Sequence, residues 1–224
     1  MAKQKKIKVD KEQARQRVKK IWPILKQAYP NAGTALRHAN PFELLIATIL
    51  SAQCTDVRVN MVTKEVFKKY KSAKDWAKAD TKHIESDIRS TGFYHNKAVS
   101  IKGASKAITE RYGGKVPDNM EELVKLPGVG RKTANVVLGN AFGKPAIACD
   151  THVIRLSRRL GLSENSDAVK LEFDLAEIVP KKSWTLFSHV LILHGRNVCN
   201  ARKPKCENCR ISKHCPAANS PALW

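Results

Sequence analysis

The chain has 224 residues, which is enough to bury a hydrophobic core in one large domain or in two smaller ones. It carries 41 Lys and Arg against 20 Asp and Glu, a formal net charge of +21, so a polyanion is the expected partner. No stretch approaches the roughly 20 apolar residues of a membrane span, and no apolar segment follows the basic run Lys3 to Lys8, so neither a membrane protein nor a secretory signal is predicted. That run is either a targeting or nucleic-acid arm or a solvated terminus.

Apolar residues recur every three to four positions along the chain and no long alternation is present, which predicts an all-α fold. A helix begins at Asn40-Pro41, a cap followed by proline at the first helical position. Another begins near Thr55. The apolar stripes of these two helices are Leu44, Leu45, Ile49 and Leu50, and then Val59, Val62, Val66 and Tyr70.

Glycines and prolines mark the ends of the next helices. Ile84 and Ile88 belong to a short helix that stops at Gly92. A longer helix with Ala98, Ile101, Ile108 and Tyr112 stops at Gly113-Gly114. Asp118 with Glu121 resembles a capping box and opens a helix that ends at Pro127, and a further helix carries Val136 and Val137. Beyond Gly143-Lys144-Pro145, helices are expected near residues 151–160, 167–178 and 183–197.

The segment Leu126 to Ala134 joins two helices through a turn with two glycines. The backbone amides of Val129, Gly130 and Arg131, with Gly128 allowing close approach, can point at one phosphate near the positive end of the following helix. The alternative is an ordinary connection between two helices. The net charge favours a DNA phosphate.

Lys132 is expected in the first turn of that following helix, beside Arg131. The helix dipole and the neighbouring guanidinium both disfavour an ammonium there, and Schiff-base chemistry needs a neutral amine. Lys132 is therefore a candidate nucleophile, and the alternative is a surface lysine that binds phosphate.

Asp150 precedes the helix expected from residue 151. Its alternatives are the N-cap of that helix and a catalytic carboxylate. The two roles could also lie at adjoining positions. Thr151 is an equally good cap, and it would leave the Asp150 carboxylate free to face a cleft.

Four cysteines, Cys199, Cys206, Cys209 and Cys215, lie within seventeen residues with the spacing C-x6-C-x2-C-x5-C. So many thiols in a chain without an expected secretory signal favour metal ligation over disulfides. They also indicate that the protein resides in the reducing cytoplasm. Their spacing fits a [4Fe-4S] cluster better than a zinc ion, whose sites more often show two C-x-x-C pairs. The first loop between them carries Arg202, Lys203 and Lys205, which would face phosphates. Cys54 and Cys149 are expected to be small buried residues.

These segments together resemble endonuclease III, a helix-hairpin-helix DNA glycosylase: the hairpin Leu126 to Ala134, Asp150-Thr151-His152-Val153, His194-Gly195 and the cysteine spacing. The resemblance covers about residues 20 to 216. It implies a six-helix barrel at 34–144, with the helix-hairpin-helix at about 120–142, and an iron–sulfur cluster domain formed by 1–33 and 145–224. The two helical domains would flank a DNA-binding cleft.

The resemblance also implies roles for individual residues. Lys132 would attack C1′ of a damaged nucleotide that has been flipped out of the duplex, and Asp150 would assist departure of the base. Gln53 would fill the gap left by the flipped base, and Phe93 would push into the opposite strand. The family commonly has leucine where this chain has Phe93, which bears on the preferred opposite base. Ser51, Asp56 and His152 are expected to line the lesion pocket.

The expected function is base-excision repair by a bifunctional glycosylase. The enzyme would remove oxidised or saturated pyrimidines from duplex DNA and cleave the abasic site by β-elimination, as a monomer in the cytoplasm, associated with the nucleoid. Two rivals remain. An adenine-specific mismatch glycosylase shares the cluster spacing but lacks the nucleophilic lysine, and a non-catalytic helix-hairpin-helix module would use Lys132 only to contact phosphate.

Overall fold

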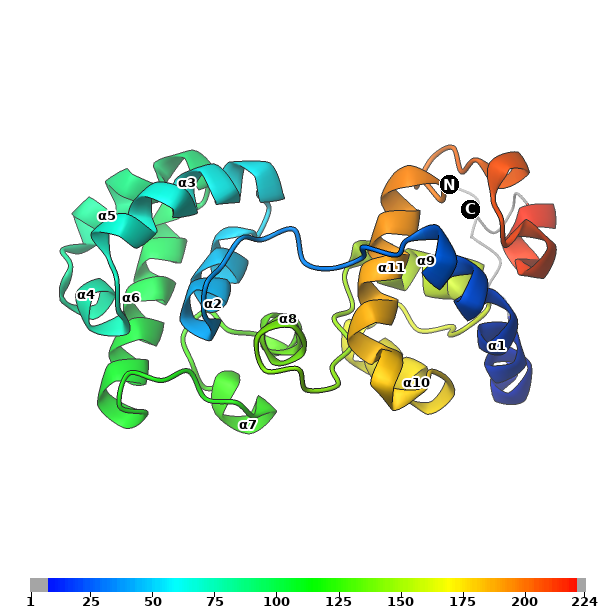
Figure 1. Cartoon of the computed structure of the whole chain (residues 1–224), viewed down its shortest axis with the longest axis horizontal. Coiled ribbons are helices and arrows are strands. Elements are labelled where there is room, and N and C mark those ends of the chain that lie inside the picture. Colours follow the sequence, from blue (N-terminus) through cyan, green and yellow to red (C-terminus); the bar gives the residue numbers. More distant parts are fainter. Residues whose placement is uncertain (1–7, 221–224) are drawn as a thin grey trace. The chain divides into compact units, whose positions relative to one another are not determined.

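The computed structural model describes residues 8–220 and is helical throughout, with no strand within that range (Figure 1). Most of the basic run Lys3 to Lys8 therefore lies outside the described residues. The chain forms two compact units. One is Thr34–Lys144, and the other joins the chain up to Gly33 to the chain from Pro145.

The unit Thr34–Lys144 is built around α2, which is buried at every position from Leu44 to Leu50 and packs against α3, α6 and α8. A helix that is apolar all round belongs in the centre of a core. The helices of this unit are α2 (Pro41–Leu50), α3 (Asp56–Lys69), α4 (Ala73–Lys78), α5 (Thr81–Ile88), η1 (Arg89–Thr91), α6 (Tyr94–Arg111), α7 (Met120–Leu123) and α8 (Arg131–Ala141).

The first two helix starts of this unit are the predicted ones. The Asn40 side chain accepts a hydrogen bond from the N–H of Glu43 at 2.9 Å, and that of Thr55 accepts one from Arg58 at 3.3 Å. The apolar stripe predicted for α3 is buried. The short helix α4 was not predicted, although Ser72 and Asp75 form a capping box at its start.

The capping box predicted for Asp118 and Glu121 is wrong. Asn119 caps α7 instead, because its side chain accepts a hydrogen bond of 2.9 Å from the N–H of Glu122. The carboxylate of Asp118 pairs with the ammonium of Lys144 at 2.7 Å. The helix is only four residues long and ends before the proline that was predicted to stop it.

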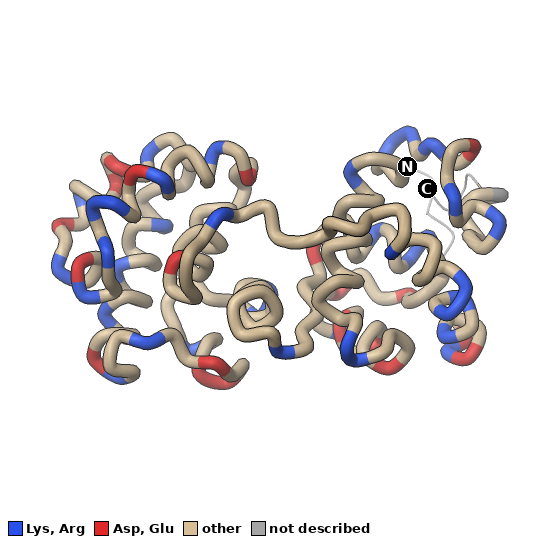
Figure 2. The backbone as a smooth tube through the Cα atoms, viewed as in Figure 1, with Lys and Arg blue, Asp and Glu red and all other residues tan. Residues whose placement is uncertain are grey.

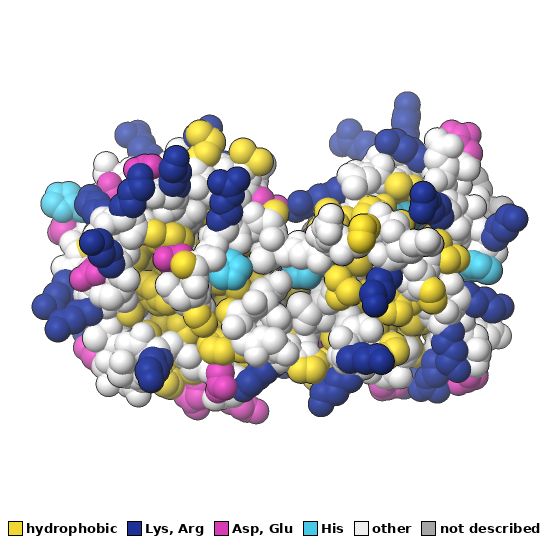
Figure 3. All heavy atoms as spheres, viewed as in Figure 1, with side chains coloured by type: hydrophobic (Ala, Val, Ile, Leu, Met, Phe, Trp, Pro, Cys, Tyr) yellow, Lys and Arg dark blue, Asp and Glu magenta, His cyan; other side chains and the backbone are white. Residues whose placement is uncertain are grey.

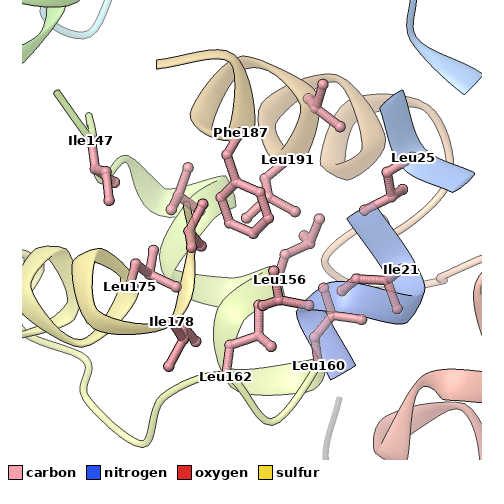
Figure 4. Close-up of a cluster of buried hydrophobic side chains, with 14 of the residues drawn as sticks. Ile21, Leu25, Ile147, Leu156, Leu160, Leu162, Leu175, Ile178, Phe187 and Leu191 are labelled. Carbon is pink, nitrogen blue, oxygen red and sulfur yellow. The ribbon is translucent and has the colours of Figure 1, made fainter. Parts of the chain in front are cut away.

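The second unit contains helices from both ends of the chain: α1 (Lys11–Ala28), α9 (Thr151–Arg159), α10 (Ala168–Ile178), η2 (Lys181–Ser183), α11 (Trp184–Asn197), η3 (Cys206–Asn208), η4 (Ser212–His214) and η5 (Pro216–Asn219). Figure 4 shows Ile21 of α1, Leu156 of α9 and Leu175 of α10 converging on Phe187 and Leu191 of α11. Burial of these side chains holds α1 against α10 and α11.

Lys and Arg residues are distributed along the backbone of both units (Figure 2), and their side chains project from the surface of each unit (Figure 3). A positive surface of this kind attracts a polyanion over the distance of a Debye length. Across the described residues, no helix combines the length and the apolar character needed to cross a membrane.

Candidate functional site

The turn between α7 and α8 is fixed by its own residues. Gly128 has a φ of 74°, and a Cβ at this position would lie 2.5 Å from the Cβ of Ser100 on α6. The Val129 side chain is buried, and its N–H donates to the carbonyl of Leu126 at 3.1 Å. Conformation and packing therefore both require glycine at position 128.

Gly130, the N-cap of α8, has no such requirement. Its φ is −87°, and a Cβ would meet nothing within 4 Å. A glycine that neither backbone nor packing demands suits the close approach of something outside the chain. Of the three backbone amides expected to bind a phosphate, that of Val129 already donates within the turn. The other two, those of Gly130 and Arg131, lie at the start of α8.

Lys132 is the second residue of α8 and is exposed. No hydrogen bond or ion pair within the described part of the chain engages its ammonium group. Because nothing ties this amine to a neighbour, it can reach a group bound at the N-terminal end of α8.

Gln53 and Phe93 share an uncommon backbone conformation. Their φ values are 53° and 49°, and they are the only non-glycine residues of the described chain with positive φ. Both side chains are exposed, Phe93 at 63%. Together with Gly128 they line a hollow of about 490 Å³ in the unit Thr34–Lys144. Strained backbone that presents an exposed side chain is characteristic of functional sites.

Ser51 and Asp56 flank the loop that carries Gln53. The Ser51 hydroxyl donates to the carbonyl of Thr48 at 2.8 Å, and Asp56 is the half-buried first residue of α3. Neither residue lines the hollow around Gln53 and Phe93.

Asp150 is the N-cap of α9, which is one of the two roles predicted for it, and the alternative cap Thr151 is not used. The Oδ1 atom of Asp150 accepts a hydrogen bond of 2.8 Å from the N–H of Val153, and Thr151 is the first helical residue. Asp150 and Lys132 belong to different units.

His152 is held by a neighbour on α9. Its Nδ1 atom lies 3.1 Å from an N–H group of Arg155, which also donates to the carbonyls of Gly195 at 3.0 Å and Cys199 at 2.9 Å. Gly195 is needed here, since a Cβ at this position would lie 2.8 Å from the imidazole of His152. Arg155 thus connects the segment after Asp150 to the first of the four clustered cysteines.

The four clustered cysteines line one pocket of about 360 Å³: Cys199, Cys206, Cys209 and Cys215. Buried Arg159 donates to the Sγ of Cys199 at 3.4 Å, and the Nε2 of His194 lies 3.5 Å from the Sγ of Cys209. Burial raises the pKa of Cys206 and Cys209, and that of Cys215 to about 11. A metal bound to these sulfurs would have to displace their protons.

The donor set fits an iron–sulfur centre. Thiolates are the ligands of such clusters and of zinc. Within residues 8–220, no three His, Cys, Asp or Glu side chains are grouped so that they could hold a single metal ion. All four cysteines line the same pocket, so each could bind one iron of a cluster held there.

The loop between Cys199 and Cys206 has a backbone held by hydrogen bonds from a buried arginine and carries exposed basic side chains. Arg159 donates to the carbonyls of Asn200 and Ala201, both at 2.7 Å. The side chains of Arg202, Lys203 and Lys205 are exposed. The loop thus presents three cations to solvent from a fixed backbone.

Of the two other cysteines, Cys149 is buried as predicted, whereas Cys54 is only half-buried, and its predicted burial is wrong. Cys54 lies in the loop between α2 and α3, which explains its partial exposure. Burial raises the pKa of the Cys149 thiol to about 12.

Three cations that organise these sites were not identified from the sequence: Lys97, Arg155 and Arg159. Lys97 and Arg159 are each 5% exposed. The only signal in the sequence is that Arg155 and Arg159 are four residues apart, as are the apolar residues Leu156 and Leu160 one position further along.

Comparison with known proteins yields consistent matches. The family described as "HhH-GPD superfamily base excision DNA repair protein" matches residues 46–181. The endonuclease III of Synechocystis sp. (strain ATCC 27184 / PCC 6803 / Kazusa) is 51% identical over 207 residues, which cover 92% of this chain and 94% of that protein.

Two solved structures are also similar. One, described as a non-covalent endonuclease III–DNA complex, has a TM-score of 0.88 and 43% identity, covering 94% of this chain and 99% of the other. The second, described as a trapped endonuclease III–DNA covalent intermediate with an estranged adenine, has a TM-score of 0.87 and 44% identity, covering 91% and 96%.

Proposed function

The chain belongs to the endonuclease III family within the HhH-GPD superfamily of base excision DNA repair proteins, and on that premise we propose that Lys132 is its nucleophile and damaged pyrimidines its substrates. The protein is a DNA glycosylase and abasic-site lyase of base-excision repair. The observation that carries the assignment of Lys132 is its exposed amine in the first turn of α8, two residues after Gly130, a glycine open to external approach.

In the proposed reaction the neutral Nζ of Lys132 forms a bond to C1′ of an oxidised or saturated pyrimidine nucleotide. The bond between C1′ and the base breaks, and the base leaves with the bonding electrons and a proton. Opening of the sugar gives an iminium between Nζ and C1′. Loss of a 2′ proton then expels the 3′ phosphate by β-elimination, and water releases the lysine.

Asp150 is proposed to act on the same nucleotide. Its carboxylate stabilises positive charge that develops on the sugar as the base leaves, and it accepts and returns protons in the later steps. One oxygen is held by the N–H of Val153, so the carboxylate has a fixed orientation. Lys132 and Asp150 come from different units of the chain.

Duplex DNA is proposed to bind through four groups of contacts. The glycine turn with Gly128, Val129, Gly130 and Arg131 contacts a phosphate. Gln53 fills the space of the extruded nucleotide, and Phe93 wedges the opposite strand. Ser51, Asp56 and His152 line the lesion pocket, and the loop of Arg202, Lys203 and Lys205 adds electrostatic attraction. We propose that the protein acts as a monomer, in the cytoplasm at the nucleoid.

Cys199, Cys206, Cys209 and Cys215 are proposed to hold a [4Fe-4S] cluster. In such a cube each cysteine binds a different iron, and the proposal is supported by all four cysteines lining one pocket. A single zinc ion would need them to converge. The cluster would supply structural support, and the surrounding residues shape the basic loop.

Borohydride trapping tests the proposed nucleophile. Wild-type protein incubated with a thymine glycol duplex and borohydride is expected to form a covalent complex, whereas Lys132→Ala is not. Lys125→Ala is the matched control, because Lys125 is also an exposed lysine of the hairpin but pairs with Glu122 at 2.6 Å. Trapping by Lys132→Ala, or none by the wild type, would contradict the proposal. A non-catalytic DNA-binding module would also leave a synthetic abasic site uncleaved.

A further inference from the structure

A buried lysine joins two loops of the unit Thr34–Lys144. Lys97 on α6 is only 5% exposed, and its ammonium donates to the carbonyl of Leu50 at 2.8 Å and to that of Thr91 at 2.9 Å. Leu50 is the last residue of α2, and Thr91 is the last residue of η1. One side chain therefore binds the C-terminal ends of two helices.

The position suits a cation but is costly for stability. Carbonyls at helix C-termini lack partners within their helix and carry the negative end of the dipole, so an ammonium there is stabilised. Burial nevertheless disfavours its charged form and lowers the pKa of Lys97. An apolar side chain of similar length would avoid that desolvation, so the lysine is better explained by what it positions than by core stability.

The two tethered loops are the ones that carry the strained residues. Gln53 follows Leu50 by three residues, and Phe93 follows Thr91 by two. These are the only non-glycine positions of the described chain with left-handed backbone, and both line the hollow that Lys97 also lines. A left-handed conformation is unfavourable for a residue with a side chain, so it persists only where the surroundings impose it.

We propose that Lys97 is a positioning residue for duplex DNA: its ammonium locks the loop of Gln53 to the loop of Phe93, so that both side chains enter the helix in register. This inference rests on the proposed roles of Gln53 and Phe93. Lys97 does not touch the reacting sugar. Lys97 instead fixes the distance between Gln53, which fills the gap, and Phe93, which wedges the opposite strand.

The first test is hydrogen exchange, which needs no DNA. Lys97→Met is expected to speed amide exchange in residues 51–55 and 91–94 together while the middle of α6 keeps its protection. Lys102→Met is the matched control, because Lys102 lies on the same helix and its ammonium donates to the hydroxyl of Thr81, at 3.3 Å, and not to a helix C-terminus. Unchanged exchange in both loops would overturn the proposal.

The second test separates positioning from general support. Strand scission at a synthetic abasic site is measured in a duplex and in a single strand, which has no gap to fill and no partner strand to wedge. In Lys97→Met the duplex rate should fall by roughly ten- to a hundredfold, with little change on the single strand. Equal losses on both substrates would show that Lys97 merely supports the fold, and so overturn the proposal.

Two outcomes keep this inference distinct from the proposed function. If wild-type protein is not trapped by borohydride, the nucleophile assignment fails, while hydrogen exchange still reports on the tether. If Lys97→Met gives no cooperative thermal transition, Lys97→Gln replaces it, since an amide can still donate without carrying charge. Failure of both variants to fold would identify Lys97 as support for the whole unit and would also overturn the proposal.

Discussion

The carboxylate of Asp150 accepts a hydrogen bond of 2.8 Å from the N–H of Val153, so one side chain both caps α9 and is proposed to assist base departure. The two roles can be separated because asparagine caps helices as well as aspartate does. Asp150→Asn should therefore leave α9 folded and duplex binding largely intact.

Base release by Asp150→Asn, measured in single-turnover excision from a thymine glycol duplex, should be slower by about a hundredfold or more, since the negative charge is lost. Asp167→Asn is the matched control, because Asp167 caps α10 through the N–H groups of Val169 and Lys170. An equal loss of rate in both variants would refute the charge-based role.

The two hairpin glycines should respond in opposite ways to alanine. Gly128→Ala places a side chain at a φ of 74° and 2.5 Å from the Cβ of Ser100, so we expect a loss of stability of about 1–3 kcal/mol in urea unfolding. Gly130→Ala meets no atom within 4 Å and should unfold like wild type, yet bind duplex DNA more weakly. Normal DNA affinity of Gly130→Ala would argue against a phosphate at this turn.

Arg159 should be needed to retain the iron–sulfur centre. Lysine carries the same charge but cannot donate through a planar fork to the carbonyls of Asn200 and Ala201 together with the Sγ of Cys199. Purified Arg159→Lys should contain less iron and absorb less near 400 nm than wild type, whereas Arg158→Lys should match wild type. Stoichiometric zinc in colourless wild-type protein would instead overturn the cluster assignment.

The burial of Cys149 predicts how the stability of the protein changes at alkaline pH. Burial raises the pKa of its thiol to about 12, so the folded protein keeps a proton that the unfolded chain loses near its ordinary, lower pKa. Because the unfolded state then binds fewer protons, stability should fall as the pH rises from about 9 towards 12. Chemical unfolding between these limits should show a smaller loss for Cys149→Val, which cannot titrate. Parallel pH profiles would show that another group controls the effect.

Helix starts were predictable where one residue could cap, and less so where two neighbours could. Asn40 before Pro41 is unambiguous, and α2 begins there. Asp118 and Asn119 are both good caps. The ammonium of Lys144, 26 residues from Asp118, binds the Asp118 carboxylate, and Asn119 caps the helix instead. The sequence alone carries no information about that long-range contact.

The same limit applies to the site. The hairpin, the cysteine spacing and Asp150 are recognisable because their residues are close in sequence. Lys97 is one of 41 basic residues, and what distinguishes it is burial between two helix ends, which arises only when α2, η1 and α6 pack together. Its importance becomes visible only in the folded chain.

The second unit is completed by a helix from the beginning of the chain, since α1 packs on α10 and α11. During synthesis, α1 leaves the ribosome more than a hundred residues before these partners exist, whereas Thr34–Lys144 is continuous and can collapse early. The apolar face of α1 must therefore stay exposed, or be shielded by a chaperone, until α10 and α11 have been synthesised. Ribosome-bound chains truncated after Lys144 would contain a folded unit preceded by α1 with its apolar face exposed and prone to aggregation.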